Sequence, residues 1–318
     1  MTLYNNFIGI DIGKFNFVVG IHGSKETKEY ANDSTGIAGF IKEYNKVLID
    51  SLCILETTGG YEMALLLSLC NKSIAVHRAN TRKVKNFIMS FGNSAKTDSL
   101  DARVLALYGY ERSEKLELFR PQSKQALDLY ELVSRRNDLK QILVAEKNRL
   151  AGPRVDIIKA SCKKMIDTLS EQIESITKEI DALIEEDPML KAKKAMLQTI
   201  EGIGRVVSNE LIALLPELGE LSRRQVASLV GVAPISNDSG KYNGYRRIGH
   251  GRSFIKPILF VAAMAARKSN SKLKVFYENL INKGKKKMVA LTALMRKIIV
   301  IANARLRDLM RPVEAKKI

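Results

Sequence analysis

The first 120 residues alternate short apolar runs with stretches of helical periodicity, and this alternation limits the folds that they can adopt. Strand-like runs occupy residues 7–21, 52–56 and 74–78, and helical patterns occupy residues 36–48, 61–71, 81–91 and 98–111. Strands that alternate with helices pack as a sheet with helices laid against it. The sequence therefore predicts an α/β domain over residues 1–120.

Long helices are predicted next, over residues 121–187. Apolar residues keep a three-to-four spacing between charged flanks, as in a coiled coil, at Ile166, Leu169, Ile173, Ile176, Ile180 and Leu183. The segment Ala151-Gly152-Pro153 is expected to break this region into two helices. An intramolecular helical hairpin and a dimer seam would both show this pattern, and we expect self-association in either case.

Residues 188–318 form a third predicted domain, mostly α-helical, which begins with a glycine pair between two apolar helices. Gly202 and Gly204 in the segment Ile-Glu-Gly-Ile-Gly are typical of a helix-hairpin-helix, whose exposed amides can hold a DNA phosphate. An ordinary helix connection has the same pattern, so both interpretations stay open. Further along, Ser222 and Gln225 predict a capping box for a helix over residues 223–230.

The net charge of +18 is concentrated near the C-terminus. Residues 240–318 contain 20 lysines and arginines against three acidic residues, whereas the preceding residues are almost neutral. Apolar residues interleave with these basic ones, which predicts folded helices with basic faces, and Lys285-Lys286-Lys287 is expected to be an exposed loop. Such a surface favours a polyanion, because each neutralised phosphate releases counterions.

Other partners are less consistent with the sequence. There is no continuous apolar span of about 18 residues and no signal peptide, so we expect a cytoplasmic, nucleoid-associated protein without a membrane partner. The three cysteines and three histidines lack the paired spacing of a zinc site. We therefore expect reduced cysteines and no zinc.

Four acidic residues occur where a metal-dependent nuclease would need them. Asp11 and Glu56 adjoin apolar runs that should be buried strands, while Asp98 and Asp101 share one face at the start of a helical pattern. Magnesium prefers oxygen ligands, and carboxylates from two strand ends and a helix start can meet at one point. Taken singly, each acid is more often a solvated surface group, and Asp98 also suits a helix N-cap.

A serine lies in a loop of small residues that precedes a basic segment. Ser239 belongs to Asp238-Ser239-Gly240, and Lys241, Arg246, Arg247 and Arg252 follow it. A hydroxyl beside guanidinium groups is what a nucleophile needs to attack a phosphodiester. In isolation, Asp-Ser-Gly is also an ordinary turn.

These motifs together resemble a known family. The ordered set FIGIDIGK, ETTGGYE, AKTDSLDARVLA, IEGIG and LVGVAPISNDSGKYNGYRRIGHGR is similar to the DEDD transposases of bacterial insertion sequences, which are related to the Piv DNA invertase. The resemblance covers nearly the whole chain. It implies a RuvC-like, RNase H-like N-terminal domain and a C-terminal transposase domain, on either side of the predicted coiled-coil segment.

The resemblance also implies a chemistry and a set of partners. Asp11, Glu56, Asp98 and Asp101 would bind Mg²⁺ or Mn²⁺, and Ser239 would be the nucleophile. The family recombines donor and target DNA through a noncoding bridge RNA, whose loops pair with both DNAs. A homodimer or homotetramer is implied, with the serine loop of one subunit brought to the acids of another.

We therefore expect serine attack on the scissile phosphate, a covalent protein–DNA intermediate, and religation without ATP. Residues expected to bind nucleic acid are Lys96, Arg103, Gly202, Gly204, Lys241, Arg246, Arg247, Arg252 and Lys256. Lys256 stands where relatives often carry arginine, so bidentate phosphate binding is in doubt there. Three alternatives remain: a RuvC-like, structure-selective nuclease that activates water, a DNA invertase, and a non-catalytic nucleic-acid scaffold.

Overall fold

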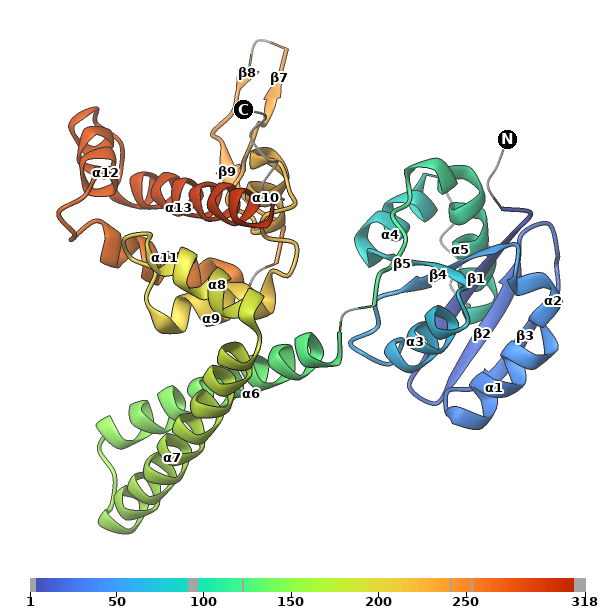
Figure 1. The fold of residues 1–318 in the computed structure, drawn as a ribbon, viewed down its shortest axis with the longest axis horizontal. Helices are drawn as coiled ribbons and strands as arrows, with labels where there is room; N and C mark the ends of the chain where they lie inside the picture. Colours follow the sequence, from blue (N-terminus) through green and yellow to red (C-terminus); the bar gives the residue numbers. More distant parts are fainter. Residues whose placement is uncertain (1–3, 91–96, 122, 241, 253, 312–318) are drawn as a thin grey trace, which may run out of the picture. The chain divides into compact units, whose positions relative to one another are not determined.

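The chain folds into two compact units, residues 1–122 and 123–318 (Figure 1). The computed structural model describes residues 4–90, 97–121, 123–240, 242–252 and 254–311. Each unit has a hydrophobic core of its own. Among the described helices, none has the length and apolar character that crossing a membrane requires.

A five-stranded sheet in the order β3-β2-β1-β4-β5 forms the centre of the first unit. Its strands are β1 (Asn6–Ile12), β2 (Asn16–Ile21), β3 (Thr27–Ala31), β4 (Ser51–Glu56) and β5 (Ala75–Ala79). The first three strands are joined by short turns and pair antiparallel, whereas β4 and β5 follow helices and run parallel to β1. β3 is absent from the predicted strands because it is a largely exposed edge strand with charged residues and no apolar run.

Helices cover both faces of this sheet. On one face, α1 (Ser34–Glu43), α2 (Asn45–Leu48) and α3 (Met63–Asn71) pack over Ile8 and Ile10. On the other face, α4 (Thr81–Met89) and α5 (Asp98–Arg112) pack over Phe7 and Ile54, and a 3₁₀ turn, η1 (Ser113–Lys115), follows α5. The predicted α/β layer structure is confirmed.

The second unit begins with two long helices, α6 (Lys124–Ala151) and α7 (Asp156–Glu186), which pack against each other as a hairpin (Figure 1). The break between them lies at the predicted glycine and proline. Ile180 of the predicted stripe and Ile184, one turn further along α7, are buried in one core with Leu129 and Val133 of α6. At this end, the stripe packs within the chain, as the intramolecular interpretation requires.

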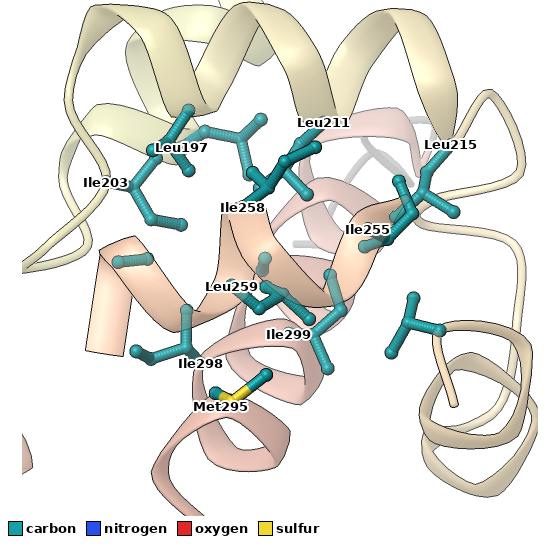
Figure 2. Close-up of a cluster of buried hydrophobic side chains, with 14 of the residues drawn as sticks. Leu197, Ile203, Leu211, Leu215, Ile255, Ile258, Leu259, Met295, Ile298 and Ile299 are labelled. Atoms are coloured by element: carbon teal, nitrogen blue, oxygen red, sulfur yellow. The ribbon is translucent and has the colours of Figure 1, made fainter. Parts of the chain in front are cut away.

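Six further helices form the body of the second unit. They are α8 (Pro188–Gln198), α9 (Arg205–Leu214), α10 (Arg223–Leu229), α11 (Ile255–Ala266), α12 (Lys272–Asn282) and α13 (Lys287–Met310). Figure 2 shows α11 between α9 and α13, with Ile258 facing Leu211 on one side and Leu259 near Ile299 on the other. The mostly helical C-terminal part and the capping box of α10 are confirmed. The three lysines of the predicted loop are exposed, but Lys287 is already the first residue of α13.

A two-stranded arm extends from this helical body (Figure 1). β6 (Pro234–Ile235) pairs with β9 (Arg247–Ile248), and β7 (Asp238–Ser239) pairs with β8 (Tyr242–Asn243). Both pairings are antiparallel, and the Gly244 amide donates to the Asn237 carbonyl between them. The segment predicted as a loop is therefore an ordered ribbon.

Candidate active site

Two glycines allow α5 to lie directly on the sheet. Gly9 of β1 and Gly20 of β2 are cross-strand partners. A Cβ on Gly9 would lie 2.0 Å from the Ala102 carbonyl oxygen, and one on Gly20 would lie 3.2 Å from the Arg103 nitrogen. Only a residue without a side chain fits at position 9, because the contacting atoms belong to the helix backbone.

The direction of α5 follows from a third glycine. A Cβ on Gly109 would lie 2.1 Å from Ile54 and 3.5 Å from Phe7, whereas Gly9 meets the helix at Ala102. The helix therefore runs antiparallel to β1. Its first turn, with Asp98 and Asp101, lies toward the carboxyl ends of β1 and β4.

Asp11 and Glu56 lie at that same end of the sheet. β1 and β4 pair in parallel up to Ile10 and Leu55, so the next residues along the two strands are Asp11 and Glu56. Side chains alternate along a strand, which places Asp11 on the face of Gly9 and Glu56 on the face of Ile54. Both are on the α5 face, and both are half-buried.

The first turn of α5 supplies the other two acids. Thr97 is the N-cap, and its hydroxyl accepts from the Leu100 amide at 3.2 Å. The alternative role of Asp98 as the N-cap is therefore wrong. Asp98 is exposed and Asp101 is half-buried, and both carboxylates interact favourably with the positive end of the helix dipole.

The loop after Glu56 is organised by a residue that the sequence analysis missed. Glu62 is completely buried, and its Oε2 accepts from Thr58 N at 3.1 Å, Thr58 Oγ1 at 3.0 Å and Gly60 N at 2.9 Å. Its Oε1 accepts from Arg78 Nε at 3.1 Å. Burial raises the pKa of Glu62, but the hydrogen bonds from backbone amides, Arg78 and Thr58 outweigh it and lower that pKa. Glu62 is the second acidic residue of the segment ETTGGYE, and its place in that segment was the sequence signal that could have identified it.

Asn32 ties this loop to the turn after β1. Its Nδ2 donates to the Gly13 carbonyl at 3.0 Å and to the Tyr61 carbonyl at 3.1 Å. The turn that follows Asp11 and the loop that follows Glu56 are thus joined through one amide. This contact restrains the two chain segments that carry the candidate acids.

The four acids have the chemistry of a metal site. They offer only carboxylate oxygens, which is the ligand type that a hard divalent cation prefers. Within the described part of the chain, no three His, Cys, Asp or Glu side chains are close enough together to hold one ion. The ligand type and the common end of the sheet fit a divalent cation, while the convergence of three ligands is not present in this conformation.

The base of the arm is locked by two glycines with positive φ. A Cβ on Gly251 would lie 2.4 Å from the Gly231 nitrogen, and one on Gly231 would lie 2.1 Å from the His250 carbonyl oxygen. Beside them, the Arg252 amide donates to the Leu229 carbonyl at 2.7 Å. The two ends of the arm are therefore held against each other by backbone contact.

Ser239 lies near the exposed end of the arm. It is the last residue of β7, its register partner is Tyr242, and its side chain is exposed. Arg246 reaches back across the ribbon, with its Nη2 3.4 Å from Asp238 Oδ2. A guanidinium thus lies next to the residue that precedes the serine.

The remaining basic candidates have different surroundings. Arg247 is exposed on β9, and Lys256 lies in the first turn of α11 with its side chain over Gly231. Arg252 binds Glu217 through two contacts of 2.5 and 2.9 Å and donates to the Leu214 carbonyl at 3.0 Å, so it supports the base of the arm. Lys96 and Lys241 lie outside the described residues.

The candidates on helices also divide into packed and accessible residues. A Cβ on Gly202 would lie 2.2 Å from the Ala262 carbonyl oxygen, so this glycine lets the α8–α9 turn pack on α11. Gly204 is exposed, has open space where a Cβ would stand, and is the N-cap of α9. Arg103 of α5 is half-buried, with its Nε 3.3 Å from the Ser99 carbonyl.

Comparisons with known proteins identify related families. Residues 8–152 match the DEDD transposase domain of IS110 elements, and residues 194–278 match the transposase family IS116/IS110/IS902. The pilin gene-inverting proteins of Moraxella lacunata and Moraxella bovis are each 27% identical over 311 residues, which cover 95% of this chain and 96% of each relative. An uncharacterised protein of insertion element IS110 from Streptomyces coelicolor is 26% identical over 156 residues, covering 48% of this chain and 38% of that protein.

Proposed function

The chain belongs to the DEDD transposases of the IS110 family, enzymes that cleave and rejoin DNA, and from this premise we propose that it is an RNA-guided recombinase of an insertion sequence. It would join donor and target DNA while a noncoding bridge RNA supplies sequence choice by base pairing. The protein would then hold nucleic acid by backbone and shape, for which the basic C-terminal region is suited.

The observation that carries this proposal is the placement of the acids. Asp11 and Glu56 lie on the α5 face at neighbouring strand ends, and α5 directs Asp98 and Asp101 toward the same end. We assign these four residues as ligands of a divalent cation, Mg²⁺ or Mn²⁺, and DEDD transposases generally depend on such a metal. When bound, the cation polarises the scissile phosphate and stabilises the leaving oxygen. The mixed five-stranded sheet supports a RuvC-like assignment of this domain.

Ser239 is the proposed nucleophile. Its Oγ forms a bond to the scissile phosphorus, the bond from phosphorus to the leaving deoxyribose oxygen breaks, and that oxygen takes up a proton. Attack by the hydroxyl of the partner strand then forms the new phosphodiester and releases Ser239 with its proton. Because the covalent intermediate conserves the phosphodiester, no ATP is consumed. Arg246 and Arg247 lie on the same arm and would stabilise phosphate charge.

The test is a search for the covalent adduct. Protein co-expressed with the RNA of its element is incubated with end-labelled junction DNA and Mg²⁺, and a denaturing gel resolves adduct, free cut ends and joined product. We expect Ser239→Ala to abolish the adduct and Ser236→Ala, an exposed serine of the same arm, to retain it. Asp11→Asn should abolish cleavage while DNA binding survives.

The same gel separates the alternatives. Free cut ends that persist in Ser239→Ala would indicate a structure-selective nuclease that activates water. Unchanged activity on DNA in Asp11→Asn would leave only the scaffold interpretation. Either result contradicts the serine recombinase.

A DNA invertase is the second candidate, because the full-length similarity is to proteins named for inverting a pilin gene. The chemistry at the acids and at Ser239 would be the same, and the arrangement of the recombining sites would differ. A plasmid with two junction sequences in inverted orientation distinguishes them. Inversion of the intervening segment identifies an invertase, whereas insertion into a second plasmid identifies a transposase.

A further inference from the structure

A pocket of about 500 Å³ lies in the first unit, on the α5 face of the sheet. Edge strand β5, helix α4, the end of α5 and the segment after it form its walls. The acids are associated with the first turn of α5, and this pocket is at the last turn. A helix of 15 residues spans about 21 Å, so the pocket is separate from the candidate active site.

Three cationic side chains line this pocket from three different elements. They are Lys83 of α4, Arg112 of α5 and Lys115 of η1, and all three are exposed. None of them forms an ion pair with a residue that the structure describes, and Glu117 is the one acidic residue among the lining residues. The lining residues of the pocket therefore carry a net positive charge.

Aromatic rings form the floor below these cations. The Phe87 and Tyr108 rings meet edge to face with centroids 5.2 Å apart, and the Arg112 guanidinium lies 5.8 Å from the Phe87 centroid. Both rings are buried, so the floor is rigid and holds Arg112 in place by a cation–π contact. The guanidinium thus has an aromatic partner and no carboxylate partner among the described residues.

His77 of β5 adds a polar group between the floor and the rim. Its Nδ1 is 2.7 Å from the Glu117 carbonyl oxygen, which assigns the hydrogen to Nδ1 in the neutral ring and leaves Nε2 as an acceptor. Burial lowers the pKa of His77, and the positive charge of Lys83 lowers it further. The lining thus combines strong donors with one neutral acceptor.

We propose that the pocket formed by Lys83, Arg112, Lys115 and His77 binds the sugar–phosphate backbone of nucleic acid. The three cations fit the phosphate oxygens of either RNA or DNA, and in RNA the His77 acceptor also fits a ribose hydroxyl. Bound there, the backbone is held at the opposite end of α5 from the acids, so the contact positions nucleic acid without taking part in the reaction. This inference rests on the proposed action on nucleic acid but not on the chemistry of Ser239.

The test compares two triple variants of the full chain. In the pocket variant, Lys83, Arg112 and Lys115 are each changed to Gln. In the control variant, Lys42, Lys46 and Lys72 are changed to Gln, which removes the same charge from exposed residues that belong to α1, α2 and the end of α3, outside the pocket. Thermal unfolding midpoints establish that both variants are folded.

Binding of the bridge RNA and of junction DNA is measured separately by fluorescence anisotropy over a series of salt concentrations. Each lost phosphate contact reduces the slope of log K against log[salt] by about 0.7 to 0.9. For the pocket variant, we expect the magnitude of this slope to fall by about 2 and the affinity at low salt to fall at least tenfold. The slope and affinity of the control variant should stay near the wild-type values. A loss with RNA alone identifies RNA as the occupant, and a loss with DNA alone identifies DNA.

If the two variants show equal slopes with RNA and equal slopes with DNA, the proposal that this pocket binds nucleic acid is wrong, even if recombination proceeds normally. Absence of nucleic-acid binding by the wild-type protein would instead contradict the proposed function. The two failures are therefore distinguishable.

Discussion

Glu62 and Arg78 form an ion pair of 2.5 Å in which the carboxylate is completely buried. The pair joins β5 to the loop that follows Glu56, and the same carboxylate binds the amides of Thr58 and Gly60. Glu62 is therefore the residue that determines the conformation of the loop beside a candidate metal ligand. Its contribution should be visible both in stability and in activity.

Replacement of Glu62 by Gln should destabilise the first unit by about 2–4 kcal/mol, because it leaves the Arg78 charge without its buried partner. Chemical denaturation monitored by circular dichroism measures this change. The matched variant is Glu43→Gln, which removes the exposed partner of Lys28 and should change stability very little. Comparable losses in the two variants would show that the Glu62 network has no special role.

The same network predicts that the stability of the first unit depends on pH in the acidic range. The pKa of Glu62 is lower in the folded protein than in the unfolded chain, so its contribution is complete above the unfolded value of about 4.5 and is lost as pH falls through the folded value. Stability of the first unit should thus decline below about pH 4.5. In Glu62→Gln, that part of the decline should be missing.

Asp181 predicts a second acid transition, in the other unit. Burial raises its pKa, but hydrogen bonds from Arg205, Asn209 and Lys194 lower it to about 2. The stabilisation is present above the ordinary value near 3.8 and is lost as pH falls toward 2. Because the network is partly solvated, we expect on the order of 1 kcal/mol. Asp181→Asn should remove this dependence in acid titrations, and an unchanged titration would contradict it.

A methyl group at position 9 should displace α5 from the sheet. Gly9→Ala places a Cβ 2.0 Å from a helix carbonyl, which should cost about 1–3 kcal/mol and abolish DNA cleavage by moving Asp98 and Asp101. Gly39→Ala is the control, because that glycine lies in α1 with open space around it and alanine favours a helix by about 0.5–1 kcal/mol. Normal cleavage by Gly9→Ala would show that the position of α5 does not matter.

Arg252 and Arg246 should have different roles, Arg252 in holding the base of the arm and Arg246 in binding DNA. Arg252→Gln breaks the contacts to Glu217 and Leu214, so amide hydrogen exchange at the base of the arm should accelerate. Arg246→Gln, on the exposed part of the arm, should leave this exchange unchanged and weaken DNA binding. If both variants affect only DNA binding, Arg252 is a nucleic-acid contact and its structural role is minor.

Much of the first unit could be predicted locally. Apolar runs located the strands that carry Asp11 and Glu56, and the helical pattern placed Asp98 and Asp101 in the first turn of one helix. Glu62 was missed because its carboxylate is paired with Arg78, which is 16 residues away on β5. The arm was missed because its strands are two residues long and have no apolar alternation.

The sequence by itself determined the strands that carry Asp11 and Glu56, the break between α6 and α7 and the identity of the acidic residues, since these depend on neighbours a few positions apart. Tertiary structure alone decided that Asp11 and Glu56 lie at one end of one sheet face and that the first turn of α5, with Asp98 and Asp101, is directed toward that end. That arrangement requires the register of β1 with β4 and the close approach of α5 to Gly9. It also decided that Arg252 binds Glu217 at the base of the arm, because the partner of a charged side chain depends on which distant segments pack together.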